Sequence, residues 1–242
     1  MKMTLFTFLL GTLSLFAQEK LVVEYRFNYD FDISKITDKK KLDFYKSSNE
    51  NTSYFELVTT KNESFFGKID KIDNNQNTGT SIGLIGGPAG NFYNNLIDKY
   101  SLFSIDLNGM KLIVKDTIKA LDWVLTKEKD KILGYDVKKA IYQKDKFMVE
   151  AWYSPKLDFR NGPNKYFGLP GIILKIVETS ISNNGNHKQI YFATAVQINN
   201  EARLIKPTKG QLISQDEFYS IIDEMNKKIE ESMNNKMDKK ID

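Results

Sequence analysis

Side chains that could do chemistry are few in this sequence. It has one histidine, His187, and no cysteine. Thiol catalysis, disulfides and zinc–thiolate sites are therefore excluded, and a Ser-His-Asp triad could form only through that histidine. His187 lies in the polar stretch NNGNHKQ, which is typical of a solvated loop, and no serine lies in a G-x-S-x-G elbow. We expect no bound metal and no other cofactor.

Two further patterns could carry chemistry, and only the folded structure can show whether they do. Residues 74–95 contain Gly83, Gly86, Gly87 and Gly90 but neither the G-K-[ST] ending nor the G-x-G-x-x-G spacing of phosphate loops. We interpret this segment as a flexible insert between strands, and the role of residues 83–90 stays open. Pairs of carboxylates for hydrolysis stay open too, because such side chains meet only in the folded chain.

The elements that must position any site are mostly strands. In residues 21–31, Val23, Tyr25 and Phe27 alternate with Glu24 and Arg26, which predicts a strand with one solvated face. Other predicted strands are at 52–60, 64–70, 121–125, 135–143, 147–153, 171–179 and 189–198. Residues 143–146 are expected to form a turn, and the polar residues 32–52 a loop with a short helix.

A hairpin over residues 100–117 has the clearest local signal. Asn108-Gly109 favours a type I′ turn, because both residues tolerate positive φ. A two-residue loop would pair Leu107 with Met110 and Asp106 with Lys111. It would also pair Ile105 with Leu112 and Phe103 with Val114, so apolar side chains meet on one face and opposite charges on the other.

The chain is predicted to end in a helix. Ser214 and Glu217 form a capping box, and Phe218, Ile221 and Met225 follow at helical spacing. Together these patterns predict a mainly β fold, a single curved antiparallel meander sheet resembling a half-barrel, with a C-terminal amphipathic helix.

Residues 1–17 resemble a secretory signal peptide. Lys2, the apolar run from Leu5 to Phe16 and Ala17 follow in the order of such signals, and the run is shorter than a bilayer span. We therefore expect residues 18–242 to form one soluble domain, periplasmic or secreted, with no transmembrane segment after cleavage. Mass spectrometry of the exported protein should find an N-terminus at Gln18. A retained Met1 in the membrane fraction would contradict this prediction.

The charge pattern excludes one class of partner. The formal net charge is +4, from 35 basic and 31 acidic residues that alternate along the chain. Because a nucleic-acid-binding protein concentrates Lys and Arg on one face, we expect no nucleic acid to bind.

The stretch YFGLPGIILKIV, residues 166–177, combines turn residues with a buried strand. Pro170 fixes φ and Gly171 supplies a positive φ, so residues 169–172 are predicted to form a type II turn. The apolar residues that follow predict a strand covered on both faces. No reactive group lies in this stretch, and we interpret it as structural first, with any ligand binding secondary.

An ordered set of motifs around this stretch resembles the GLPGLI family of exported Gram-negative proteins. The matching residues are Trp123, Ile132, Gly134, Tyr135, Lys139, Ala140, Trp152, Gly162, Pro163, Gly168, Leu169, Pro170, Gly171, Ile172 and Ile173. The resemblance covers roughly residues 20–235. Val137 stands where many relatives have cysteine, so a thiol or metal role does not transfer. The resemblance implies export and a β-rich fold, and it implies no established activity.

Two functions remain open from the sequence. The first is a non-catalytic periplasmic protein that binds an apolar or peptide-like ligand or assists an outer-membrane partner, as the many Phe and Tyr residues favour. The second is a hydrolase that acts on peptide or glycan through two carboxylates, one of which has a raised pKa. The first would need a pocket on an open sheet face, the second two convergent acids in a cleft.

Overall fold

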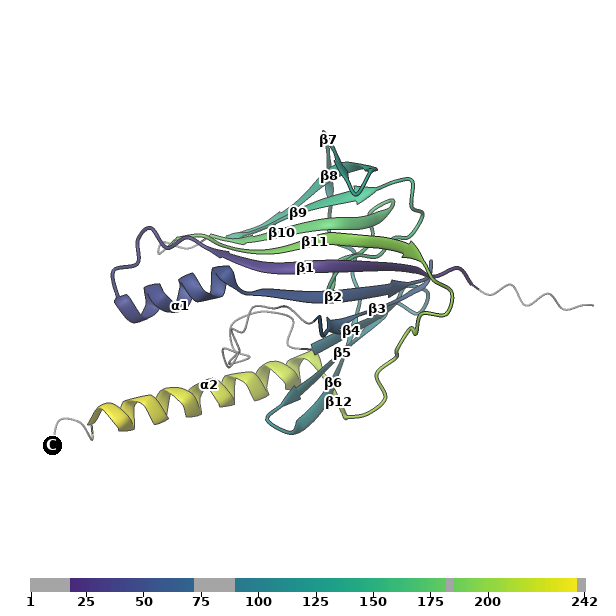
Figure 1. Cartoon of the computed structure of the whole chain (residues 1–242). Coiled ribbons are helices and arrows are strands. Elements are labelled where there is room, and N and C mark those ends of the chain that lie inside the picture. The colour runs from purple at the N-terminus through teal and green to yellow at the C-terminus, as the bar shows by residue number, and fades with distance from the viewer. Residues whose placement is uncertain (1–17, 72–89, 182–184, 239–242) are drawn as a thin grey trace, which may run out of the picture.

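The computed structural model describes residues 18–71, 90–181 and 185–238, and most of them are in strands (Figure 1). The strands are β1 (Leu21–Phe31), β2 (Thr52–Thr59), β3 (Glu63–Ile69), β4 (Gly90–Asn95), β5 (Tyr100–Leu107), β6 (Met110–Thr117), β7 (Val124–Ile132), β8 (Tyr135–Lys144), β9 (Phe147–Ser154), β10 (Ile172–Ser180), β11 (His187–Ile198) and β12 (Gln211–Ser214). The helices are α1 (Lys39–Glu50) and α2 (Gln215–Asp238).

All twelve strands belong to one open sheet. Their order is β12-β6-β5-β4-β3-β2-β1-β11-β10-β9-β8-β7, so β12 and β7 are the edges. The N-terminal strand β1 lies in the middle, between β2 and β11. The predicted mainly β class with a C-terminal helix is confirmed. One detail differs from a pure meander, because β12 pairs with β6 in parallel.

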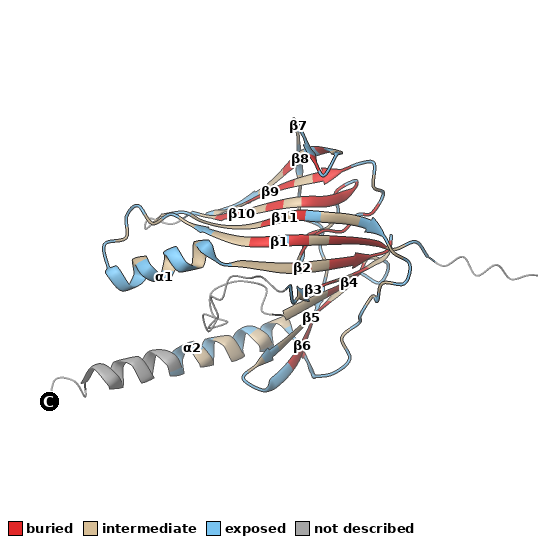
Figure 2. Ribbon diagram, in the orientation of Figure 1, coloured by how far each residue is buried: buried red, intermediate tan, exposed pale blue. Residues whose placement is uncertain are grey.

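The sheet has two unlike faces. The core face carries the side chains of Val23, Tyr25 and Phe27 together with their cross-strand neighbours Phe55 and Tyr191, all buried. The outer face carries Arg26 and its neighbours. Figure 2 shows the buried stretches on the middle strands β1, β2, β10 and β11. Aromatic rings of the core face pack edge to face, as with Phe27 against Phe55 at 5.9 Å, or stack, as with Phe55 on Phe66 at 5.2 Å.

The hairpin of β5 and β6 has the predicted register throughout. Leu107 pairs with Met110, Asp106 with Lys111 and Phe103 with Val114. Asn108 and Gly109 both have positive φ, 54° and 91°, as the type I′ turn requires.

Other elements differ from the predictions. The strand expected at 121–125 begins only at Val124 and continues to Ile132 as the edge strand β7. The patterns did not predict β4 or β12, and residues 72–89 of the glycine-rich segment lie outside the described residues. His187 was expected in a solvated loop, but it begins β11 and its ring stacks on Phe31 at 5.9 Å.

Both helices have side-chain caps at their N-termini. The Asp38 carboxylate accepts a hydrogen bond from the Lys41 amide at the start of α1. The predicted capping box of α2 is confirmed, because the Glu217 carboxylate accepts from the Ser214 amide at 2.7 Å and the Ser214 hydroxyl accepts from the Glu217 amide at 3.2 Å. Phe218 and Ile221 of α2 pack near the β12 edge of the core face.

Residues 155–171 connect β9 to β10 and cross the core face. Asn161 is fully buried there and bonds to two distant strands: its amide donates to the Thr59 hydroxyl at 3.0 Å, and its carbonyl accepts from the Ser64 hydroxyl at 3.2 Å. Leu169 and Tyr166 of the same segment are also buried. The motif-bearing segment is therefore a cover that closes part of the open sheet.

The turn at Pro170 differs in type from the prediction. Gly171 has the expected positive φ, 146°. However, its amide donates to the Leu169 carbonyl at 2.8 Å, while the Ile172 amide donates to Leu157 at 3.1 Å and not to Leu169. The bend is thus a three-residue turn around Pro170. A four-residue turn does not form, because the Ile172 amide donates to the Leu157 carbonyl instead. No helix among the described residues is both long and apolar enough to cross a membrane.

Candidate functional site

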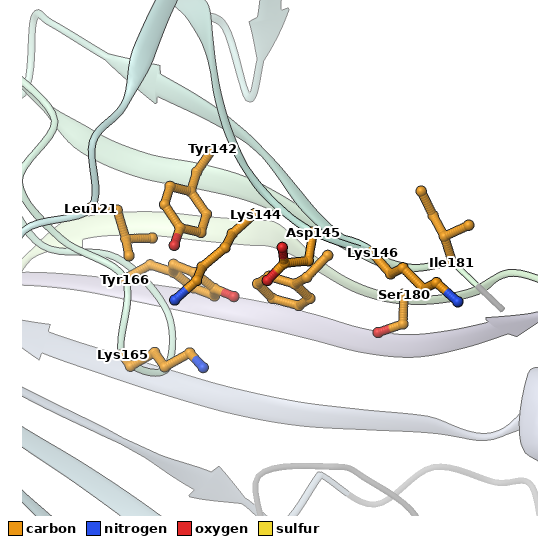
Figure 3. Close-up of a pocket in the computed structure, with 10 residues that line it drawn as sticks. Leu121, Tyr142, Lys144, Asp145, Lys146, Lys165, Tyr166, Ser180 and Ile181 are labelled. Atoms are coloured by element: carbon orange, nitrogen blue, oxygen red, sulfur yellow. The ribbon is translucent and has the colours of Figure 1, made fainter.

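A pocket of about 460 Å³ opens between the cover and the ends of β8, β9 and β10. We call it the lysine-rimmed pocket. It is lined by Leu121, Tyr142, Lys144, Asp145, Lys146, Phe147, Lys165, Tyr166, Ser180 and Ile181, most of which are labelled in Figure 3. Four stretches of chain contribute to it, at Leu121, 142–147, 165–166 and 180–181, so only the folded sheet with its cover can form it.

The rim of the pocket is positively charged. It carries three lysines and one acid, all exposed: Lys144, Lys146, Lys165 and Asp145. The Lys165 ammonium lies 6.0 Å from the ring centroids of both Phe147 and Tyr166. Because the turn between β8 and β9 carries two of these lysines next to apolar side chains, the rim can attract an anion while the wall binds an apolar group.

The wall of the pocket is aromatic and is held by the cover. The Trp123 indole N–H donates to the Phe167 carbonyl at 3.1 Å. The Trp123 ring lies 6.2 Å from Tyr166 and 6.4 Å from Tyr142, measured between centroids. Trp123 therefore braces the two tyrosines that line the pocket, without lining it.

Beside this wall lies a buried group of polar side chains, which we call the Glu178 cluster: Tyr29, Asn164, Tyr166, Glu178 and Tyr191. The Asn164 amide donates to the Tyr191 hydroxyl at 3.2 Å. Four other polar atoms of the cluster are buried without a hydrogen-bonding partner among the described residues. They are Tyr29 Oη, Asn164 Oδ1, Tyr166 Oη and Glu178 Oε1.

Glu178 is the main titratable group of this cluster. Its side chain points to the core face near the C-terminal end of β10, and the residue is only 8% exposed. Burial raises the pKa of this carboxyl, and the neighbouring Lys165 ammonium and Tyr166 hydroxyl oppose the shift. The Tyr166 hydroxyl is close enough to act on the carboxyl but lies outside hydrogen-bonding geometry. Burial also raises the pKa of Tyr166 itself.

The outer face has a second hollow, of about 550 Å³, around Val177, Ile190 and Phe192. Next to it, the Lys139 ammonium binds Glu150 at 3.1 Å and lies 5.7 Å from the Trp152 ring centroid. These contacts satisfy the lysine within the sheet.

A cross-strand pair of acids, Glu24 and Glu56, also lies outside both pockets. Burial and the Glu24 carboxylate raise the pKa of Glu56, whereas Lys71 pairs with Glu24. This pair has the raised pKa that a carboxylate mechanism needs, but neither acid lines a described pocket.

The motif residues are divided between the two faces of the sheet. Six of them lie in the cover: Gly162, Pro163, Gly168, Leu169, Pro170 and Gly171. Trp123 bonds to the cover, and Ala140 is buried on the core face. Lys139 and Trp152 pair across β8 and β9 on the outer face. Gly134 and Tyr135 lie at the turn between β7 and β8, where Gly134 has a φ of 80°. The motifs therefore do not converge on one site.

Several pocket residues were not singled out from the sequence. Tyr142, Lys144 and Lys165 carry no motif, and neither does Glu178 of the neighbouring cluster. These residues meet only through strand pairing and the cover. One signal was present, because Glu178 is an acid within an apolar strand that was predicted to be covered on both faces. A buried acid in such a strand needs a partner or a function.

Comparisons with known proteins give a fold likeness and a short family match. The family model described as "Protein of unknown function (Porph_ging)" matches residues 141–175, which include β9 and the cover. A comparison with curated proteins finds no match. Among solved structures, PNGF-II in two crystal forms, C2 and P21, resembles this chain with a TM-score of 0.56 and 18% identity, over 84% of this chain. The chain spans only about a third of PNGF-II, 32% and 33% in the two forms.

Proposed function

We propose that this chain is an exported, non-catalytic binding protein that takes an apolar ligand bearing a carboxylate, peptide-like in nature, in the lysine-rimmed pocket. The observation that carries the proposal is the combination of an aromatic wall with three rim lysines. The apolar part of such a ligand would cover Tyr142, Phe147 and Tyr166, and its carboxylate would lie among the lysines. Membership of the GLPGLI family is part of the proposal and agrees with the match over 141–175.

Export and a partner in the outer membrane also belong to this proposal. What supports export is the pattern of residues 1–17, which lie outside the described residues. A carrier that delivers its ligand to an outer-membrane partner would release it from a pocket that opens at one end of the sheet. The fold likeness to PNGF-II agrees with the fold alone and adds nothing about the ligand.

The alternative is a hydrolase that acts on peptide or glycan through carboxylates. One observation favours it, the raised pKa of the buried Glu178 carboxyl near the pocket. Among the described residues, no second carboxyl group acts on Glu178. The charged group that does act on it is the Lys165 ammonium. Recovery of a bound peptide or glycan intact after long incubation separates binding from hydrolysis.

Charge reversal at the rim tests the proposed function. We expect Lys165→Glu to weaken the binding of 3-phenylpropanoate about tenfold, because an attractive charge becomes a repulsive one near the carboxylate. Binding can be followed by Trp123 fluorescence in a Trp152→Phe background, since Trp123 contacts the pocket tyrosines. Lys209→Glu, the same change at an exposed lysine beside the opposite edge strand β12, is the matched control. Equal weakening by both variants would contradict the proposal.

A further inference from the structure

The Glu178 cluster contains most of the buried polar atoms that are unpaired among the described residues. Five buried side-chain atoms of the described residues have no hydrogen-bonding partner, and four of them belong to this cluster. An unpaired buried polar group costs about 1–3 kcal/mol, so native proteins keep such groups where a ligand or water completes them. Glu178 and Tyr166 are 8% and 1% exposed, so bulk solvent does not satisfy them.

The cluster adjoins the lysine-rimmed pocket directly. Tyr166 belongs to both, and Lys165, which acts on the Glu178 carboxyl, lines the pocket. Ser180 also lines the pocket and lies on the same face of β10, two residues beyond Glu178. Tyr166 is therefore the residue shared by the pocket and the unpaired atoms.

The unpaired atoms match the hydrogen-bonding groups of an amide. The Tyr29 and Tyr166 hydroxyls can donate to a carbonyl oxygen, and Asn164 Oδ1 and Glu178 Oε1 can accept from an N–H. The Asn164 amide nitrogen donates one hydrogen bond to Tyr191, and its Oδ1 is the atom without a partner among the described residues. A fatty acid would leave both acceptors unpaired, whereas a peptide unit has an N–H for one acceptor and a carbonyl oxygen for the two hydroxyls.

We propose that the Glu178 cluster binds the amide of an acylated amino acid unit, so that the ligand of the pocket is the C-terminal residue of a peptide. The inference rests on the proposed function, which places the carboxylate at the lysine rim. The side chain of that residue lies against the aromatic wall, and the amide that precedes it reaches the cluster. The specificity of the pocket for peptides over fatty acids then comes from Tyr29, Asn164, Tyr166 and Glu178.

Two ligands that differ only in the amide test this inference. N-acetylphenylalanine carries an acetamido group that 3-phenylpropanoate lacks, and both carry the same ring and carboxylate. We expect the Kd of N-acetylphenylalanine to be about tenfold lower in the Trp123 fluorescence titration, the gain of one or two hydrogen bonds. Tyr166→Phe and Tyr29→Phe should each remove most of this preference. Tyr29 does not line the pocket, so Tyr29→Phe should also leave the binding of 3-phenylpropanoate unchanged.

These variants are well suited because each removes a hydroxyl that makes no hydrogen bond in the described structure. Ser154→Ala is the matched control, since Ser154 Oγ is the fifth buried unpaired atom and its residue belongs neither to the pocket nor to the cluster. It should keep the full preference for N-acetylphenylalanine. A loss of preference in Ser154→Ala as large as in Tyr166→Phe would overturn the assignment.

The outcomes separate this inference from the proposed function. If both carboxylates bind equally well, the cluster holds water only, the inference fails and the proposed function stands. If neither binds, the proposed function fails, and the neutral N-acetylphenylalanine amide then decides the inference. If the N-acetylphenylalanine amide binds to the wild type but not to Tyr166→Phe, the amide subsite is supported. If it does not bind to the wild type, the inference is overturned.

Discussion

Replacement of Gly171 by valine is expected to lower the free energy of unfolding by about 4 kcal/mol. Gly171 has a φ of 146°, which side-chain-bearing residues rarely adopt. A Cβ added there would lie 2.1 Å from the Ser154 carbonyl oxygen, so the backbone of β9 or β10 must shift. The figure combines about 1–3 kcal/mol for backbone strain with a similar amount for overpacking. Thermal or urea denaturation measures the loss.

Two other variants separate the causes of this loss. Gly134 also has a positive φ, 80°, but its surroundings within 4 Å are open, so Gly134→Ala carries the strain without the clash. Gly171→Ala should therefore destabilise the protein more than Gly134→Ala. Pro170→Ala should cost only about 0.4–1 kcal/mol, through the unfolded chain. If Gly171→Val is as stable as the wild type but loses ligand binding, the bend is a recognition surface and its structural role is wrong.

Glu178→Gln is expected to make the free protein more stable than the wild type at neutral pH. Burial raises the pKa of the Glu178 carboxyl above its usual 4.5 in the folded state. Such a group contributes stability below pH 4.5 that is lost as the pH rises through the raised pKa. Glutamine has the same shape and cannot ionise. The advantage of the variant should therefore be small near pH 4 and grow by about 1.4 kcal/mol for each unit of the shift.

Unfolding by urea at a series of pH values measures this difference. The titratable and charged groups that face Glu178 are Lys165, Tyr166, Tyr29 and Tyr191. Burial raises the pKa of all three tyrosines above their ordinary 10, so none of these hydroxyls ionises between pH 4 and pH 8. Glu217→Gln is a control of opposite sign, because the Ser214 backbone bond lowers the pKa of Glu217. That variant should lose stability at neutral pH. A Glu178→Gln variant whose stability relative to wild type does not change with pH would rule out the raised pKa.

Local patterns were sufficient for the elements whose pairing is local. The β5–β6 hairpin was predicted residue by residue, because Asn108-Gly109 fixes the turn and the turn fixes the register. The capping box of α2 likewise depends on Ser214 and Glu217 alone. The edge strand β7 was misplaced because its residues TKEKD are mostly exposed on both faces, so no alternation marks them. The short strand β12 pairs with the distant β6, and no local signal specifies that contact.

The candidate site was beyond local patterns for a physical reason. Its aromatic wall comes from β8, β9 and the cover, and the acid beside it, Glu178, comes from β10. The glycine and proline motifs predicted a sharp bend before a buried strand, which the structure contains, although the type of turn differs. These motifs did not predict that Asn161 of the cover bonds to β2 and β3. Nor did they predict that the cover forms part of the pocket wall through Tyr166.

The central claim, that the lysine-rimmed pocket holds an apolar carboxylate, is tested most directly by NMR chemical-shift mapping with 3-phenylpropanoate. We expect the amide signals of Tyr142, Phe147, Lys165 and Tyr166 to shift with one common Kd. The signals of Ile190 and Phe192 in the outer hollow should stay unchanged. Shifts confined to the outer hollow, or no saturable shift at all, would contradict the claim.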